Sequence, residues 1–264
     1  MVVCARVAIF RGMQPNLPRI RVVDLETGGS GSDDVCEIGW QDLRRDDDGM
    51  WRLDDERGAL LVNPGRPMSL DTMAVHHILN SQVSGAPYWK EIAPTVLRPE
   101  GGIAALGAHR AAFEQRYCRP RFTGGVDWIC TWKCALRLWP DLPRFSNQML
   151  RYLRMPEGLV HEEGLPAHRA GPDAYVTAHH LRDMLNQASV AQLLAWSREP
   201  GLLPRVPAGP ARGRPWADLS EDVLRAFAAE RDLDVRFSAQ TELRRRGDDL
   251  VVEDEDGSEQ TTLF

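Results

Sequence analysis

Residues 19–32, RIRVVDLETGGSGS, decide the fold of this chain. A run rich in β-branched residues leads into two acidic residues and then into glycines and serines, which is the composition of a strand that ends in a loop. Asp24 and Glu26 lie two positions apart near the end of that strand, so their side chains point to the same face of the sheet. Mg²⁺ and Mn²⁺ prefer carboxylate oxygens, and a pair of such ions suits phosphodiester hydrolysis. A solvated turn shows the same pattern, so the motif alone does not establish a metal site.

The chain up to residue 197 alternates between strand-like and helix-like segments. Strands are predicted at 35–43, 59–62, 103–108 and 128–130, with 44–58 as a hairpin connection. One helix is predicted within 67–80, capped near Ser69 or Asp71, and another within 88–97, where Pro94 is expected to break it. Further helices are predicted at 111–118, 131–138, 146–153 and 172–187. This alternation predicts an α/β fold with a central mixed sheet flanked by helices.

The composition changes after Trp196, where proline and glycine become frequent. Residues 198–247 are predicted as a linker and a small helical C-terminal module, with helices at 221–230 and 235–246. Residues 248–264 carry seven carboxylates and no basic residue, which predicts a disordered acidic tail. Residues 1–18 are predicted as an N-terminal extension of the 19–197 domain. Without the tail the formal charge of −6 becomes +1, so overall acidity does not exclude a polyanionic partner.

Hydropathy and cysteine usage narrow the class of protein. No window is long and apolar enough for a membrane span, and Arg6 interrupts the short apolar run near the N-terminus. The five cysteines are an odd number without a CxxC pair, which argues against a disulfide framework and a zinc ribbon. We therefore expect a soluble, cytoplasmic protein with buried free thiols and no membrane partner.

A second acidic motif lies at residues 168–173, HRAGPD. Pro172 suits the first turn of a helix, and Asp173 falls in the same turn. A carboxylate at this position is able to complete a metal site, and His168 just before the helix is able to act as a general base near neutral pH. A surface histidine with an acidic residue favoured by the helix dipole explains the motif equally well.

Taken together, these motifs resemble the DEDDh family of 3′-to-5′ exonucleases, and most closely its exonuclease X branch. The resemblance runs from about residue 19 to 187. DLETGG carries the first motif, HRAGPD the last, and 63–78, NPGRPMSLDTMAVHHI, is similar to the segment that leads to the histidine-containing stretch at His76. WICTWKCALRLWPDLPRFSNQML, residues 128–150, resembles the segment after the middle motif. The resemblance implies an RNase H-like fold.

The middle motif departs from the family pattern Ala-His-Asn-x-x-Phe-Asp. Here Ala108-His109-Arg110-Ala111-Ala112-Phe113-Glu114 has Arg110 in place of Asn and Glu114 in place of Asp. Glu114 keeps the charge on a side chain longer by one methylene, so it remains able to serve as an outer or water-bridged ligand. Arg110 either binds a substrate phosphate or pairs with an acidic neighbour.

The resemblance implies a role for each of these residues. Asp24, Glu26, Glu114 and Asp173 hold two Mg²⁺ or Mn²⁺ ions, and His168 activates the attacking water. The terminal nucleotide then leaves as a 5′-monophosphate. Substrate contacts are expected from the remaining motif residues: Thr27, Gly28, His76, Arg110 and Phe113. For Phe113 the alternative of an aromatic side chain in the core is kept.

The sequence thus predicts a metal-dependent 3′-to-5′ exonuclease whose partner is the 3′ end of single-stranded DNA, with RNA as the alternative substrate. A nucleic-acid-binding module that has lost hydrolysis through Arg110 and Glu114 is the alternative from another class. The C-terminal module resembles the small domain that follows the nuclease in exonuclease X-like proteins. Its arginines either contact phosphates or form a solvated helix end: Arg205, Arg212, Arg214 and residues 244–246.

Overall fold

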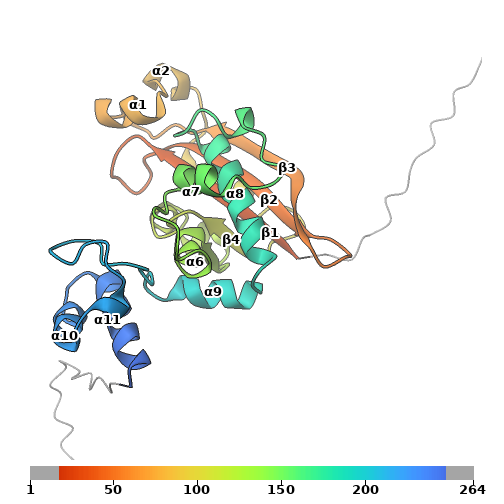
Figure 1. Ribbon diagram of the computed structural model, residues 1–264. Helices are drawn as coiled ribbons and strands as arrows, with labels where there is room; N and C mark the ends of the chain where they lie inside the picture. The colour runs from red at the N-terminus through yellow and green to blue at the C-terminus, as the bar shows by residue number, and fades with distance from the viewer. Residues whose placement is uncertain (1–17, 248–264) are drawn as a thin grey trace, which may run out of the picture. The chain divides into compact units, whose positions relative to one another are not determined.

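A five-stranded mixed β-sheet forms the centre of the larger part of the molecule (Figure 1). The structure is a computed structural model that describes residues 18–247. The strand order is β3-β2-β1-β4-β5, so the strand that carries Asp24 and Glu26 is central, as predicted. β1 pairs antiparallel with β2 and parallel with β4. The strands span Arg19–Thr27 (β1), Val35–Arg45 (β2), Trp51–Leu61 (β3), Ala105–Ala108 (β4) and Trp128–Cys130 (β5).

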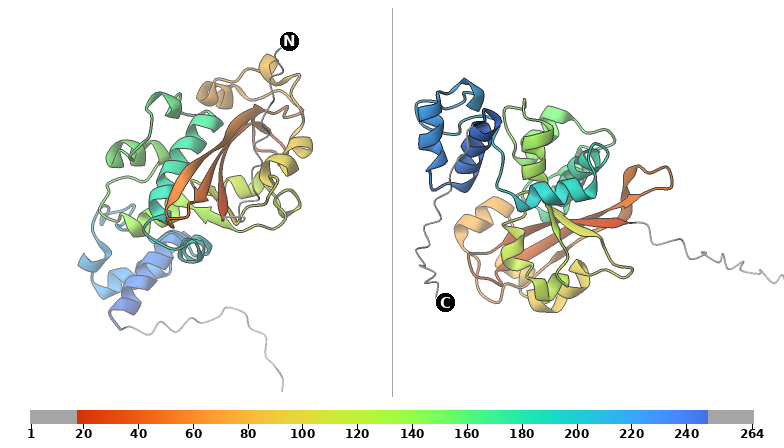
Figure 2. Two further views of the ribbon diagram at one scale, coloured as in Figure 1. Left: turned by 90° about the vertical axis from the view of Figure 1, so that its right-hand side faces the viewer. Right: turned by 90° about the horizontal axis from the view of Figure 1, so that it is seen from below.

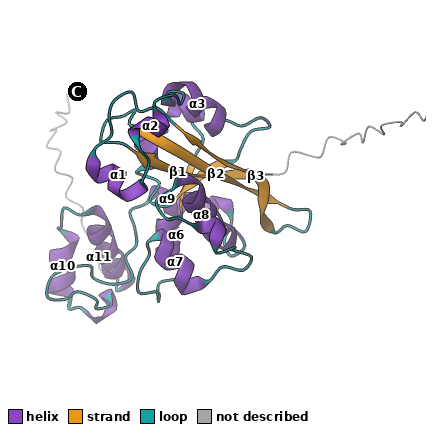
Figure 3. Ribbon diagram, turned by 90° about the horizontal axis from the view of Figure 1, so that it is seen from above, coloured by secondary structure: helices purple, strands orange, loops and turns teal. Residues whose placement is uncertain are grey.

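Helices cover both faces of the sheet, which confirms the predicted RNase H-like architecture. α8 (Ala170–Leu185) packs across β1, β2 and β3 on one face, and α3 (Trp89–Leu97) lies on the opposite side (Figure 3). Buried side chains of α3, Trp89 and Leu97 among them, join the core formed with β1 and β2. The other helices of this part are α1 (Leu70–His76), α2 (Asn80–Val83), α4 (Glu114–Tyr117), α5 (Pro120–Thr123), α6 (Thr131–Leu138), α7 (Asn147–Arg154) and α9 (Val190–Arg198), with a 3₁₀ turn η1 (Glu162–Gly164).

Three expectations about local structure were wrong. The third strand starts at Trp51 rather than at residue 59, because the hairpin closes within Asp46–Met50, where Gly49 adopts a φ of 82° (Figure 2). Pro94 does not break α3, whose hydrogen bonding continues from Arg98 N–H to the Pro94 carbonyl. α9 occupies residues that were not assigned to any helix. By contrast, Ser69 caps α1 as expected, its hydroxyl accepting from the Thr72 N–H.

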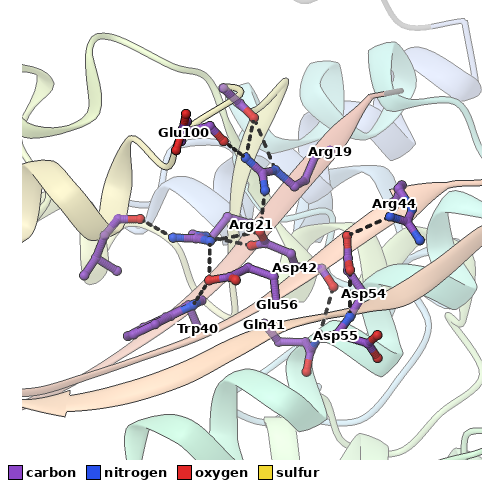
Figure 4. Close-up of polar contacts among 12 residues, drawn as sticks. Arg19, Arg21, Trp40, Gln41, Asp42, Arg44, Asp54, Asp55, Glu56 and Glu100 are labelled. Carbon is purple, nitrogen blue, oxygen red and sulfur yellow. Dashed lines mark hydrogen bonds and ion pairs between the residues drawn. The ribbon is translucent and has the colours of Figure 1, made fainter. Parts of the chain in front are cut away.

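A buried ion pair ties the beginning of β1 to its neighbours (Figure 4). Arg21 Nε and Nη2 donate to the two oxygens of Asp42 at 2.6 and 2.9 Å, and Arg21 Nη1 donates to the Val96 carbonyl at 2.6 Å. Asp42 is fully buried and Arg21 is 2% exposed. Burial raises the pKa of the Asp42 carboxyl, and the Arg21 guanidinium opposes that rise. The pair fixes β1, β2 and α3 together at the strand end remote from Asp24 and Glu26.

The chain divides into two compact units with a boundary between Arg198 and Glu199. Among the described residues, the smaller unit comprises Trp139–Asp141 and residues 199–247, and Trp216 belongs to its core together with side chains of α10 (Glu221–Ala228) and α11 (Leu233–Arg245). Some of its arginines have structural partners: Arg245 pairs with Glu242, and Arg246 also donates to the Trp216 and Leu219 carbonyls.

Two further predictions concern the whole chain. Within residues 18–247, no helix combines the length and apolar character needed to cross a membrane. The described cysteines, Cys36, Cys118, Cys130 and Cys134, are buried free thiols. The expected N-terminal extension and acidic tail lie outside the described residues, apart from Pro18.

Candidate active site

The two acidic residues of the DLE motif lie near the end of β1, beside the start of α8. In the β1–β2 register Asp24 is opposite Gly39 and Glu26 is opposite Glu37, and a β-bulge follows Glu26. A Cβ atom on Gly39 would lie 2.1 Å from the backbone carbonyl of Ala170. Only a glycine at this point of β2 therefore allows the first turn of α8 to approach the sheet this closely.

The first turn of α8 brings the HRAGPD residues to the same place. Asp173 is 8% exposed, and its Oδ2 accepts a hydrogen bond from the His168 backbone N–H at 2.6 Å. This bond closes the loop before the helix, in which His168 has a left-handed φ of 61°. One ligand atom from each of Glu26, His168 and Asp173 lies within 4.8 Å of the other two. The side chain of His168 remains exposed to solvent.

Side chains outside the predicted motifs hold this arrangement. Gln148 at the start of α7 donates to Asp173 Oδ1 at 2.7 Å, and Asn147 donates to the Asp173 carbonyl at 3.1 Å. Glu37 accepts two hydrogen bonds from Arg169 and one from the Ala170 N–H at 2.8 Å, so a β2 carboxylate caps α8. Asn147, Gln148 and Glu37 were not predicted from the sequence, because their contacts with Asp173 and Arg169 join positions that are far apart in the chain.

Glu114 approaches the same centre from the start of α4. Its side chain is 3% exposed, and its Oε2 has no hydrogen-bond partner among the described residues. A buried carboxylate oxygen without a donor is costly, and a cation is one way to offset that cost. Burial raises the pKa of Glu114 to about 8, and the charge of Glu26 adds to this rise.

Burial and, after it, mutual repulsion disfavour the charged forms of these carboxyls. Burial, followed by the charges of Asp173 and Glu114, raises the pKa of Asp24 well above its usual range. Burial and the charges of Asp173 and Glu37 raise the pKa of Glu26 to about 8, although Arg169 opposes the rise. Arg169 is the one cation among the causes of these three shifts. A divalent cation with oxygen ligands fits this site, because it replaces the missing positive charge and the missing donor at Glu114.

Comparison with known proteins agrees with this geometry. The chain is 34% identical to exodeoxyribonuclease 10 of Escherichia coli (strain K12) over 163 residues, which are 61% of this chain and 70% of that relative. It belongs to the exonuclease X family. A solved structure of exonuclease X in complex with 5′ overhanging duplex DNA is 30% identical, with a TM-score of 0.56 over 67% of this chain and 99% of that one. As a member of the exonuclease X family, the protein is a 3′-to-5′ exonuclease.

More distant structures share the fold alone. A structure of exonuclease I that was described in terms of processivity has a TM-score of 0.53 at 12% identity, and covers 83% of this chain and 61% of that one. No protein-family model matches the chain.

Two of the expected substrate contacts in this exonuclease X homologue lie beside Glu114. The plane of Arg110 lies over the Trp132 ring, 4.2 Å from its centroid, and no carboxylate pairs with it among residues 18–247. The alternative of an ion pair is therefore not seen. Arg110 has a left-handed φ of 63°, a conformation in which Asn, the usual family residue, is more common. Phe113 is 37% exposed, so the alternative of a core aromatic was wrong.

The other expected contacts surround the loop after β1. Gly28 is buried, and a Cβ on it would lie 2.4 Å from Met68 Cγ, so its lack of a side chain admits Met68. His76 is 2% exposed; its Nδ1 accepts from the Ile78 N–H at 3.0 Å, and its Nε2 lies 3.6 Å from Cys36 Sγ. His76 is thus buried against Cys36 of β2, and its predicted contact with substrate stays a prediction, as does that of the half-buried Thr27.

Proposed function

We propose that this protein removes nucleotides from the 3′ end of single-stranded DNA and releases nucleoside 5′-monophosphates. The observation that supports the proposal is the cluster of Glu26 from β1 and Asp173 from α8 with the exposed His168. The charges of Asp24 and Glu114 act on the same group of carboxylates. DNA is favoured over RNA because the relative that shares 34% identity is an exodeoxyribonuclease and the solved exonuclease X structure contains DNA. We propose a cytoplasmic location, which the buried free thiols support.

Asp24, Glu26, Glu114 and Asp173 would hold two Mg²⁺ or Mn²⁺ ions. When bound, such ions neutralise the phosphodiester, orient it and lower the cost of charge on the attacking and leaving oxygens. Asp173 keeps its direction because Gln148 and the His168 N–H occupy its two oxygens. Glu114 contributes the free Oε2, and its longer side chain compensates for the absence of the usual Asp.

His168 is proposed to accept the proton of the attacking water. Its backbone is fixed by Asp173, and the next residue, Arg169, is fixed by Glu37, so the ring is presented from a rigid turn. Its exposure allows the proton to pass on to solvent after each cycle. The 3′-terminal nucleotide then departs with the phosphate on its 5′ oxygen.

A catalytically weakened binding module remains the second candidate, because Arg110 and Glu114 replace the family residues. The unpartnered Glu114 Oε2 weighs against it, since a protein without a cation would leave this group buried at a cost that nothing offsets.

The deciding experiment follows single-stranded DNA and RNA of one sequence, labelled at either end, in Mg²⁺ or Mn²⁺. We expect stepwise shortening of DNA from the 3′ end, which stops with a chelator and in Asp173→Asn. His168→Gln should reduce kcat by about 100-fold or more while strand binding in chelator is kept. Binding without shortening in either metal would refute the enzyme proposal, and faster cleavage of RNA would refute the substrate assignment.

A further inference from the structure

Four arginines close to Glu114 have no carboxylate partner among the described residues. Residues 103–126 contain Arg110, Arg116, Arg119 and Arg121 but only one acidic residue, Glu114, so the segment has a formal charge of +3 in a chain of net charge −6. We call these four the arginine segment. Elsewhere in the same unit an arginine commonly pairs with a carboxylate, as Arg21, Arg52 and Arg169 do. The arginine segment is therefore not an ordinary charged surface of this protein.

Aromatic rings lie beside three of the four guanidinium groups, those of Arg110, Arg116 and Arg121. Arg110 lies 4.2 Å from the Trp132 ring centroid and Arg121 lies 4.6 Å from that of Phe122. Arg116 lies 5.9 Å from the Phe113 ring and 5.6 Å from that of Tyr117. A guanidinium that lies on an aromatic face keeps its N–H edges available, and these match the oxygens of a phosphodiester. Arg110, Arg116 and Arg121 are exposed.

The position of the arginine segment relates it to the active site. α4 begins at the candidate ligand Glu114, which is buried, and Arg116 lies two residues later on the exposed side of this short helix, against the exposed ring of Phe113. A strand whose last phosphodiester reaches Glu114 must continue away from a centre of buried carboxylates, where its phosphates need positive charge. Arginines interleaved with aromatic rings are the usual composition of a surface that binds single-stranded nucleic acid.

We propose that the arginine segment binds the phosphates of the single DNA strand upstream of its 3′-terminal nucleotide. The inference rests on the proposed function and adds to it the path by which the strand leaves the site. It assigns Arg116, Arg119 and Arg121 to substrate binding, and it gives Arg110 a phosphate partner in the position where the family has Asn.

The test measures binding of fluorescent oligothymidylate to the full chain in chelator, as a function of salt. Arg116→Gln combined with Arg121→Gln should weaken binding on the order of tenfold at about 0.1 M salt and reduce the slope of log affinity against log salt by about 0.7 for each phosphate left without an arginine. In Mg²⁺ the double variant should raise KM on a long strand more than on a dinucleotide. The matched control is Arg52→Gln, an exposed arginine paired with Asp46 and Asp48, which should leave affinity and slope unchanged.

The outcomes separate this inference from the function on which it rests. A wild-type chain that neither binds nor shortens DNA contradicts the proposed function. A wild-type chain that shortens DNA, with a folded double variant of unaltered affinity and salt slope, overturns the arginine segment alone. A loss of affinity confined to duplex DNA, with single strands bound as tightly as before, also overturns it, because the strand assignment would then be wrong.

Discussion

Replacing Glu114 by Gln tests the charge balance of the active site without measuring hydrolysis. Burial raises the pKa of Glu114 from 4.5 to about 8. A carboxyl whose pKa is higher in the folded state than in the unfolded state adds to the free energy of unfolding at low pH, where it is protonated. That stability is lost as the pH rises between the two values, because the unfolded chain gives up its proton first. The whole shift corresponds to on the order of 5 kcal/mol, of which about 1 kcal/mol falls between pH 7 and 8.

Urea unfolding in chelator, at pH of about 7 and about 9, measures this loss. Above about pH 7 the histidines are neutral in both states. Burial also raises the pKa of the Cys36, Cys118 and Cys134 thiols, so they too cost stability in this interval. Wild type and variant share this thiol contribution, so the difference between the two proteins isolates Glu114. We expect the wild type to lose stability across this interval and Glu114→Gln to lose less and to be the more stable protein at the higher pH. Added Mg²⁺ should stabilise the wild type and should stabilise the variant less, because the variant lacks a ligand.

Glu162→Gln is the matched control, since Glu162 is exposed and lies outside the cluster. It should follow the wild type in both conditions. An equal loss of stability between the two pH values in wild type and Glu114→Gln would refute the raised pKa of Glu114. An equal gain from Mg²⁺ in wild type and Glu114→Gln would refute the assignment of Glu114 as a ligand.

Three further predictions concern the scaffold. Asp42→Ala leaves the buried Arg21 with only the partly exposed Glu56, 3.4 Å from its Nη2, and should lower the free energy of unfolding by about 3 kcal/mol. Arg52→Ala, at an exposed pair, should leave urea unfolding nearly unchanged, and equal effects would contradict the burial argument. Gly39→Ala forces the start of α8 off the sheet, so it should cost about 1–3 kcal/mol and also abolish most exonuclease activity, and an active variant would show that the close approach is unnecessary. Burial lowers the pKa of His109 to about 4, so protonation of this residue should cost stability as the pH drops from about 6.5 towards 4. In urea titrations His109→Gln should therefore gain stability relative to wild type over this interval, and a constant difference between the two proteins would contradict the argument.

Periodicity and composition predicted the sheet and its central strand, because a β-branched run before DLE and the alternation of strands and helices are local signals. The same signals failed at Trp51, since residues 51–58 are as polar as a loop. They form a strand only through pairing with β2, and the exposed face of an edge strand needs no apolar side chains. The prediction that Pro94 breaks the helix was wrong for a related reason. The packing of Trp89 and Leu97 in the core outweighs the tendency of proline to interrupt a helix.

The motifs named the carboxylates but not what directs them. Glu37 contacts Arg169, which lies 132 positions later in the chain, and Gln148 contacts Asp173, which lies 25 positions later. No spacing rule connects such distant positions. Arg110 shows the complementary limit. Its two sequence-based alternatives, a phosphate contact and an acidic partner, both concerned charge, whereas its main neighbour in the structure is the aromatic face of Trp132.

The glycine at position 39 also matters for how relatives of this enzyme are sorted. A search for intact nucleases normally asks whether the acidic residues are present. In this fold that criterion is incomplete, because a homologue is able to retain every carboxylate and still lack an assembled centre if a bulkier residue faces the start of α8. Position 39 lies on β2, which carries none of the proposed metal ligands. The residue at this position therefore separates active homologues from those that have every carboxylate but no assembled active site.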